Sequence, residues 1–247
     1  MAGPSGIQES ARIAAAHGRE RERVGPFLAT FTPGTDHPYL NYAIPDDGAE
    51  PGEEEVAALE ELFTARGLVP RVEALASTAP AAEAALRAAG WAEEARLVVM
   101  TCSTPSDLGA PPGVELIVPE DPEAQDTLVR VQAEAFGEPP PAPDAGGEKQ
   151  ALLSRGGQAV LALAGGKPAA GGIVVAPVEG VAELAGLGVL EGFRRRGIGA
   201  AVTAELTRRA LASGTRLVWL TPGDEGAERI YARAGFAVEG EMVHLRR

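Results

Sequence analysis

Apolar residues recur along the chain at two spacings, which predict alternating helices and strands. In residues 55–66 they fall at intervals of three and four, as on one face of a helix, and Gly67 ends the pattern. Short apolar runs between glycine and proline clusters indicate strands instead. Helices are expected at residues 7–23, 55–66, 79–89, 122–136, 149–155, 198–212 and 226–234, and strands at 26–31, 40–44, 69–76, 96–101, 114–118, 158–164, 168–175, 181–190, 217–221 and 242–245. This alternation is typical of an α/β protein with a mixed sheet.

A proline- and glycine-rich segment and an internal repeat divide the pattern into two units. Residues 82–100 align without gaps with residues 227–245, and seven of the nineteen positions are identical. We therefore expect two copies of one half-fold, at residues 1–104 and 114–247, joined by a linker at 105–113.

The first copy lacks the basic turn and the tyrosine that are the candidate functional groups of the second copy. It has the acidic sequence PDDGAE where the second copy has a basic turn, and Leu86 where the second has Tyr231. We interpret it as a degenerate partner. The sequence PPPAPDAGG at residues 139–147 is expected to form an irregular loop, which is either a mobile lid or an ordinary surface loop.

The basic turn follows the predicted strand 181–190 and has the form R-x-x-G-x-G from Arg194 to Gly199. The two glycines allow close approach of a ligand to the backbone, and the helix that begins there presents unpaired N–H groups. Such a site suits a phosphate or pyrophosphate. No G-x-x-x-x-G-K-[ST] loop is present, and the glycines from Gly186 to Gly192 fit a dinucleotide fingerprint poorly because the apolar strand continues past them. A basic turn that only caps a surface helix is the structural alternative.

Charge and composition narrow the classes of function. The net charge of −13 argues against a nucleic-acid partner, although the chain from Arg194 onward carries ten arginines against six acidic residues. A single cysteine and three dispersed histidines predict no disulfide and no metal site. The first residues lack a signal-peptide pattern and no long apolar run appears, so we expect no membrane association and a soluble, cytoplasmic protein.

Two segments together resemble the GCN5-related N-acetyltransferases (GNATs). The turn matches their motif A, [Q/R]-x-x-G-x-[G/A], and the sequence AERIYARAGF at residues 227–236 resembles their motif B. The resemblance implies the acyl-CoA N-acyltransferase fold and acetyl-CoA as cosubstrate, without a metal. It implies that the cofactor is held by the strand residues Leu187, Gly188 and Val189 and by the turn residues Arg194, Arg195, Arg196, Gly197, Ile198, Gly199 and Ala200. Asp224 stands where relatives often carry a cofactor-contacting asparagine, which puts that contact in doubt.

The resemblance also suggests an acid and a base. Glu183 lies fourteen residues before Gly197, the interval at which histone-type relatives carry a glutamate base, and strand alternation would place it on one face with Val189. A water chain, with Glu183 merely a solvated carboxylate, is the alternative. Tyr231 matches the motif B tyrosine and is the candidate acid; the alternative is a core tyrosine.

The function expected from these features is direct transfer of the acetyl group from acetyl-CoA to a primary amine of a small molecule or protein. A non-catalytic acyl-CoA sensor or scaffold is the alternative, and an interaction module that binds no cofactor is a third hypothesis. The acceptor and the oligomeric state, including a homodimer, are left open.

Overall fold

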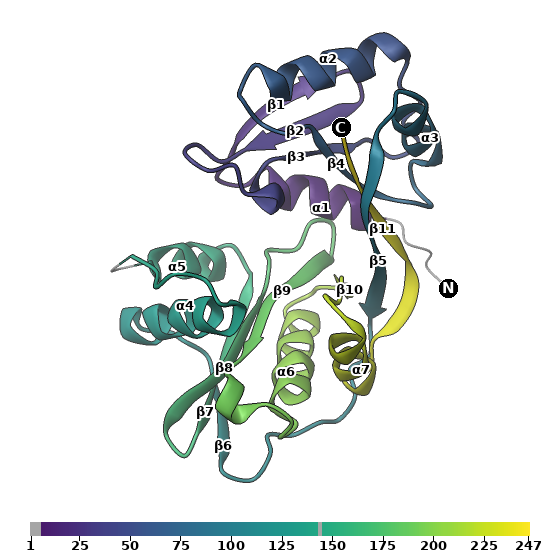
Figure 1. The fold of residues 1–247 in the computed structure, drawn as a ribbon. Helices are drawn as coiled ribbons and strands as arrows, with labels where there is room; N and C mark the ends of the chain where they lie inside the picture. Colours follow the sequence, from purple (N-terminus) through teal and green to yellow (C-terminus); the bar gives the residue numbers. More distant parts are fainter. Residues whose placement is uncertain (1–5, 143–144) are drawn as a thin grey trace. The chain divides into compact units, whose positions relative to one another are not determined.

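The computed structural model describes residues 6–142 and 145–247, without the side chain of residue 148. The chain forms two compact units (Figure 1). Unit 1 comprises Met1–Val99 and Val238–Arg247, and unit 2 comprises Met100–Ala237. The predicted loop at 139–147 is irregular at residues 139–142 and 145–146, its last residue, Gly147, begins a helix, and residues 143–144 lie outside the described part.

Unit 1 is a strongly twisted sheet with helices packed on it (Figure 1). Its strands follow the order β1-β2-β3-β4-β11, and all neighbours are antiparallel except β3 and β4, which are parallel. The strands are β1 (Glu20–Val24), β2 (Phe27–Phe31), β3 (Tyr42–Pro45), β4 (Arg71–Leu75) and β11 (Ala237–Arg246), and the helices are α1 (Ile7–Ala15), η1 (Pro38–Leu40), α2 (Glu53–Thr64) and α3 (Pro80–Ala88). Phe27, Phe63 and Trp91 lie in its buried core.

Unit 2 is a sheet covered by helices on both faces (Figure 1). Its strands are β6 (Val114–Ile117), β7 (Gln158–Ala164), β8 (Lys167–Val174), β9 (Val181–Val189) and β10 (Leu217–Leu220), and its helices are α4 (Pro122–Phe136), α5 (Gly147–Ser154), η2 (Glu191–Phe193), α6 (Ile198–Ala212) and α7 (Glu225–Arg233). Successive strand residues point to opposite faces. A Cβ on Gly171 would lie 2.2 Å from Leu128 of α4, and one on Gly172 would lie 3.1 Å from Leu206 of α6, so α4 and α6 cover opposite faces of β8.

The expected mixed α/β class is confirmed, and the helices at 122–136 and 198–212 have the expected bounds. The expected helix at 7–23 is wrong in its second half. It ends at Ala15, and Glu20–Val24 forms strand β1 of a hairpin with β2. Gly18 has a φ of +70°, which a continuing helix does not allow. The charged residues that follow contain too few apolar positions for their spacing to distinguish a helix from an edge strand.

The chain passes between the units in two long strands. β5 (Ala92–Cys102) begins in unit 1, and its last residues pair with β10 of unit 2, from Met100↔Leu220 to Cys102↔Val218. β11 follows α7 of unit 2 and pairs with β4 of unit 1. The two compact units therefore do not coincide with the parts of the chain before and after residues 105–113, because unit 1 also contains most of β11. The assignment of residues 105–113 as a boundary between sequence repeats stays a prediction.

The segment expected to be a linker is fixed to unit 2. The Ser106 amide donates to the Ala234 carbonyl at 2.9 Å, and the Leu108 carbonyl accepts from Arg208. A Cβ on Gly235, which has φ +103°, would lie 2.8 Å from the Ser106 nitrogen, so this close backbone approach requires glycine. Residues 105–113 are therefore an irregular strap on unit 2 rather than a free tether.

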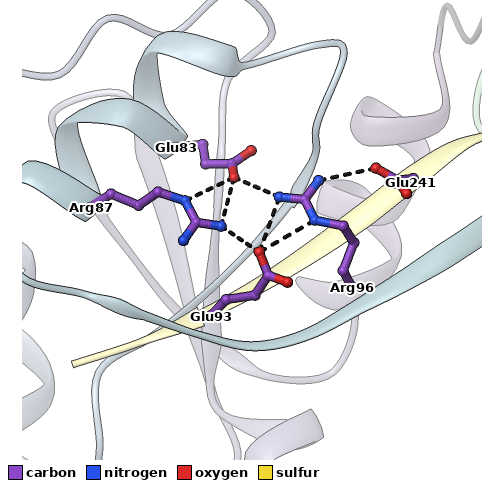
Figure 2. Close-up of polar contacts among 5 residues, drawn as sticks. All are labelled: Glu83, Arg87, Glu93, Arg96 and Glu241. Carbon is purple, nitrogen blue, oxygen red and sulfur yellow. Dashed lines mark hydrogen bonds and ion pairs between the residues drawn. The ribbon is translucent and has the colours of Figure 1, made fainter.

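An ion-pair cluster holds β11 within unit 1 (Figure 2). Arg96 of β5 lies 3.1 Å from Glu241 of β11 and 2.7 Å from Glu83 of α3, and it also contacts Glu93. Arg87 contacts Glu83 and Glu93, which closes the cluster. The pKa of Arg96 is raised, chiefly by its hydrogen bond to Glu93.

Replacing the central arginine of this cluster tests its contribution. Because the groups are partly exposed, we expect Arg96→Met to lower the free energy of unfolding by about 1 kcal/mol or less, and less at high salt. Urea unfolding at low and high salt measures this, with Arg130→Met as control, since Arg130 hydrogen-bonds only Thr127 in the described structure. An Arg96 effect that does not change with salt would contradict an electrostatic origin.

Candidate active site

Strands β9 and β10 of unit 2 run side by side only over their first residues. Their parallel pairing covers Val181↔Leu217 to Glu183↔Trp219 and stops there, while β9 continues to Val189. Within the described chain, the later part of β9 pairs with β8 on one side and with no strand on the other. Parting strands leave a wedge that a ligand with amide groups can enter as a short additional strand.

A β-bulge shapes the open part of β9. β8 and β9 pair as Gly171↔Gly188 and Ile173↔Ala185, so β9 has two residues where β8 has one. The bulge includes Gly186, with φ +60°, whose carbonyl accepts a hydrogen bond from Gln132 Nε2 of α4 at 2.7 Å. This side chain therefore fixes the backbone where β9 changes direction.

The bulge also reverses which side chains share a face. A Cβ on Gly188 would lie 2.6 Å from Ala135 of α4, whereas Val189 approaches Gly199 of α6. The extra residue of the bulge therefore places Glu183 on the α4 face and Val189 on the α6 face. The expectation that Glu183 and Val189 share a face is wrong, because strict alternation does not survive a bulge.

The glycine turn after β9 presents free backbone donors. Arg195 and Gly197 have φ values of +60° and +80°, and α6 begins directly after them without a side-chain cap. Among the described residues no acceptor is found for the amides of Ile198, Gly199 and Ala200. Three unpaired N–H groups at the positive end of a helix dipole form an anion site.

The three arginines of the turn have different roles. Arg194 donates from Nε to the Val189 carbonyl at 3.0 Å and from Nη2 to the Ala135 carbonyl at 3.4 Å, so it ties the end of β9 to α4. Arg196 stacks over Phe193 with 5.4 Å from its Cζ to the ring centroid. Only Arg195 extends along the pocket without a described partner in the hydrogen-bond and ion-pair network, and it adds positive charge there.

A pocket of about 870 Å³ connects the wedge, the turn and α7. Its walls include nearly all residues expected to hold the cofactor: Leu187, Gly188, Val189, Arg194, Arg195, Gly197, Ile198, Gly199, Ala200 and Asp224, together with Tyr231. Arg196 instead borders a neighbouring cavity with Pro111 and Ile198. Glu183 is not part of the pocket wall.

Tyr231 of α7 has the properties of a proton donor. Burial, with a smaller contribution from Asp224, raises its pKa to about 12, so the hydroxyl stays protonated near neutral pH. Its ring packs against Phe236 with 6.1 Å between the centroids. A protonated hydroxyl at the pocket wall is able to donate to a departing anion.

Asp224 caps α7. Its carboxylate accepts from the Ala227 amide at 2.7 Å, which is the usual role of an N-cap aspartate. It lines the pocket as well, so it adds negative charge beside Tyr231. The N-cap hydrogen bond therefore explains why an aspartate stands at position 224, independently of any contact with a cofactor.

Glu183 lies where the two strands part. It is half-buried and is the last β9 residue with a β10 partner, Trp219, whose side chain is 3% exposed. Because Glu183 is not among the residues of the pocket wall, we expect a proton passing from the pocket to this carboxylate to move through an intervening water.

Sequence reasoning missed the contribution of α4. Gln132, Ala135 and Phe136 lie at its C-terminal end, and the last two line the pocket. Phe136 is 56% exposed, an unusual position for a large apolar side chain. The helical pattern predicted α4, but no motif in the sequence indicates that its end meets β9.

The corresponding wedge of unit 1 is closed. β3 and β4 are parallel and pair at Ala43↔Val72, and beyond this pair Gln8 of α1 lies between them. Gln8 Nε2 donates to the Pro45 carbonyl at 3.1 Å, its Oε1 accepts from the Leu75 amide at 2.8 Å, and the residue is 1% exposed. The backbone groups that a ligand would use are therefore satisfied by the protein itself.

The described residues contain no group of three His, Cys, Asp or Glu side chains able to hold a metal ion. No helix in residues 6–142 and 145–247 is both long and apolar enough to cross a membrane.

Known proteins share this architecture. The sequence model of the Acetyltransferase (GNAT) family matches residues 125–236, which include α4, the β9 wedge, the turn and α7. A GCN5-related N-acetyltransferase from Kribbella flavida has 27% sequence identity and a TM-score of 0.80, with 97% of this chain and 93% of that chain covered. Residues 125–236 therefore match the GNAT family by sequence, and the whole chain has the GNAT fold. By homology it is a GNAT-family acetyltransferase.

More distant structures show the same fold for both units. A GCN5-related N-acetyltransferase from Sphaerobacter thermophilus has 18% identity and a TM-score of 0.68, with 99% of this chain and 93% of that chain covered. A tandem GNAT protein from the clavulanic acid biosynthesis pathway has 15% identity and a TM-score of 0.61, with 90% and 78% covered. The latter supports a two-unit GNAT arrangement here. No curated protein matches the chain.

The raised pKa of Tyr231 is directly measurable in this GNAT protein. Among the three tyrosines, we expect ultraviolet absorbance to show a tyrosinate component that titrates near pH 12 and is absent from Tyr231→Phe. Because the unfolded chain ionises first, near pH 10, the free energy of unfolding should fall between about pH 10 and pH 12, and fall less in Tyr231→Phe. A Tyr231 component that titrates at the ordinary pKa would contradict its burial.

Proposed function

We propose that unit 2 transfers the acetyl group of acetyl-CoA directly to a primary amine. The observation that carries this proposal is the set of unpaired amides of Ile198, Gly199 and Ala200, residues that line the same pocket as Tyr231, whose hydroxyl stays protonated. Donors for a diphosphate and a donor for a leaving thiolate are the two requirements of acetyl transfer from a coenzyme A thioester.

The cosubstrate would lie along β9 and the turn. Its pyrophosphate would accept hydrogen bonds from the first turn of α6, with Arg195 adding charge, and its pantetheine amides would meet the β9 backbone at Leu187–Val189. The bulge fixed by Gln132 turns this part of β9 away from β10 and so supports the orientation.

The reaction balances with the groups present. A neutral amine attacks the thioester carbonyl carbon, a C–N bond forms, and the C–S bond breaks as the tetrahedral intermediate collapses. Tyr231 donates its proton to the departing sulfur. The amine proton leaves through a water to Glu183, or through the same water to solvent, since Glu183 stands back from the pocket wall.

The position of Glu183 also favours a second candidate function, a non-catalytic acyl-CoA sensor. A sensor needs the pocket but no base beside it. Acetyl-CoA incubated with a panel of primary amines separates the two: acceptor-dependent thiol release supports the enzyme, whereas calorimetric binding without release supports the sensor.

A carboxylate at the turn tests the anion site. Gly197→Glu introduces a negative charge beside the free amides at a position with φ +80°, so we expect coenzyme A affinity to fall by more than about 100-fold in calorimetry. Gly192→Glu is the matched control, because a Cβ there has no neighbour within 4 Å and Gly192 is outside the pocket wall. Equal affinity of the two variants would contradict the assignment of the turn.

Removing the Tyr231 hydroxyl tests the acid. We expect Tyr231→Phe to lower kcat by about 100-fold and to leave coenzyme A affinity nearly unchanged, since the ring and its packing remain. Tyr39→Phe, a change at an exposed tyrosine of unit 1, serves as control. An unchanged kcat would remove Tyr231 from the mechanism.

The closed wedge of unit 1 determines the stoichiometry. We expect calorimetry to give a single coenzyme A per chain, because Gln8 already satisfies the Pro45 and Leu75 backbone groups. The Gly197→Glu variant should then bind none. Residual coenzyme A binding of ordinary strength in that variant would show that unit 1 has an open site.

A further inference from the structure

Unit 1 has a second concave surface, separate from its closed wedge. A cavity of about 750 Å³ lies between one face of α1 and one face of the β1–β2 hairpin. On α1 its wall includes Arg12 and Ile13, with Ala16 directly after the helix, and on the hairpin it includes Arg21 and Arg23. Arg19 and His17, in the turn between the helix and the hairpin, complete it.

The charges of strand β1 are segregated between its two faces. Arg21 and Arg23 alternate with Glu20 and Glu22, so the arginines share one face and the glutamates the other. Glu22 pairs with Arg66, which extends from the end of α2, at 2.7 Å. The cavity therefore receives only the basic side chains of this strand, in a protein whose net charge is −13.

Neighbouring carboxylates neutralise only part of the cluster. Asp46 lies 2.6 Å from Arg23 and 3.5 Å from Arg12, and Asp47 lies 3.5 Å from Arg12. Within the described chain, no ion pair or hydrogen bond of the side chains of Arg19 and Arg21 is found. Glu9 is the acidic residue of the cavity wall, so an excess of positive charge remains.

Arg19 is held in place at the cavity wall. Its guanidinium lies over the Tyr42 ring with 5.5 Å from Cζ to the centroid, and its Nη1 is buried and has no hydrogen-bond partner in the described structure. A ligand in the cavity does not reach a nitrogen that water does not reach, so Arg19 contributes its positive charge and the accessible part of its guanidinium.

Protection of an edge strand is the simpler explanation for charges on β1, which is the last strand of its sheet. Edge protection works with exposed charges of either sign. It does not explain why the wall of a cavity carries four arginines against one acidic residue, Glu9.

We propose that this cavity of unit 1 binds a small organic anion, with Arg19 and Arg21 holding its phosphate or carboxylate group and Ile13, Ala16 and Leu28 contacting its apolar part. Arg21 is exposed and Arg19 is half-buried beside Tyr42, and both line the cavity. Arginine suits such groups because its planar fork donates two parallel hydrogen bonds. This site is independent of the acetyl-CoA pocket.

Calorimetry on the full chain in the Gly197→Glu background tests the site, since that variant excludes phosphate binding at the turn. Phenyl phosphate and benzoate are the probes, and they distinguish a phosphate from a carboxylate ligand. We expect saturable binding of one of them, with an affinity of about 1 mM or tighter, and weaker binding of inorganic phosphate, which lacks an apolar part.

Arg21→Gln should weaken the preferred probe by about tenfold or more, because it removes a charged hydrogen bond without disturbing a described contact. Arg19→Gln should do the same, and Arg130→Gln on α4 of unit 2 is the matched control. Absence of saturable binding for both probes, or equal affinity of Arg21→Gln and Arg130→Gln, would overturn the proposal. Because Arg21 is exposed, the Arg21→Gln result decides even if Arg19→Gln fails to fold.

Discussion

The parting of two parallel strands is the constraint on which the site of this protein depends. β9 and β10 pair as far as Glu183↔Trp219, and beyond that point β9 is held only from one side. A bulge at Gly186, fixed by Gln132, reverses the alternation of side chains, and the turn that follows brings the bare end of α6 to the same opening. Backbone groups of β9 that a continuous sheet would pair, and the N–H groups that every helix leaves unpaired in its first turn, therefore face one opening.

The two units differ in how they treat the wedge between their parallel strands. Each has a parallel pair of strands whose pairing ends early. In unit 2 the opening remains and is bordered by unpaired amides, whereas in unit 1 the buried side chain of Gln8 bridges the two backbones. The internal glutamine satisfies the backbone groups of unit 1 that a ligand would otherwise use.

The sequence was sufficient for features that depend on local chemistry. The period of residues 198–212 and the glycines at 197 and 199 predicted a helix with an open N-terminus. Tyr231, which was chosen from the resemblance to motif B, lines the same pocket. Features that depend on contacts between distant parts of the chain could not be predicted from the sequence. The bulge arises from the contact of Gln132 with a strand far along the chain, and the exchange of β5 and β11 depends on which strand edges meet in the folded protein. Charged segments such as residues 20–24 were misassigned because their structure is decided by a hairpin partner and not by an apolar period.

The exchanged strand β11 has a consequence for the order in which the protein assembles during translation. Residues Met1–Val99 of unit 1 are made first, yet β4 lacks its neighbour on the side opposite β3 until the whole of unit 2 has left the ribosome, because β11 follows α7. The nascent first unit therefore waits with an exposed strand edge, and its completion is coupled to the synthesis of the half that carries the site. Damage to residues 238–247 would accordingly be felt in the fold of the first unit, although these residues are the nearest in sequence to the second.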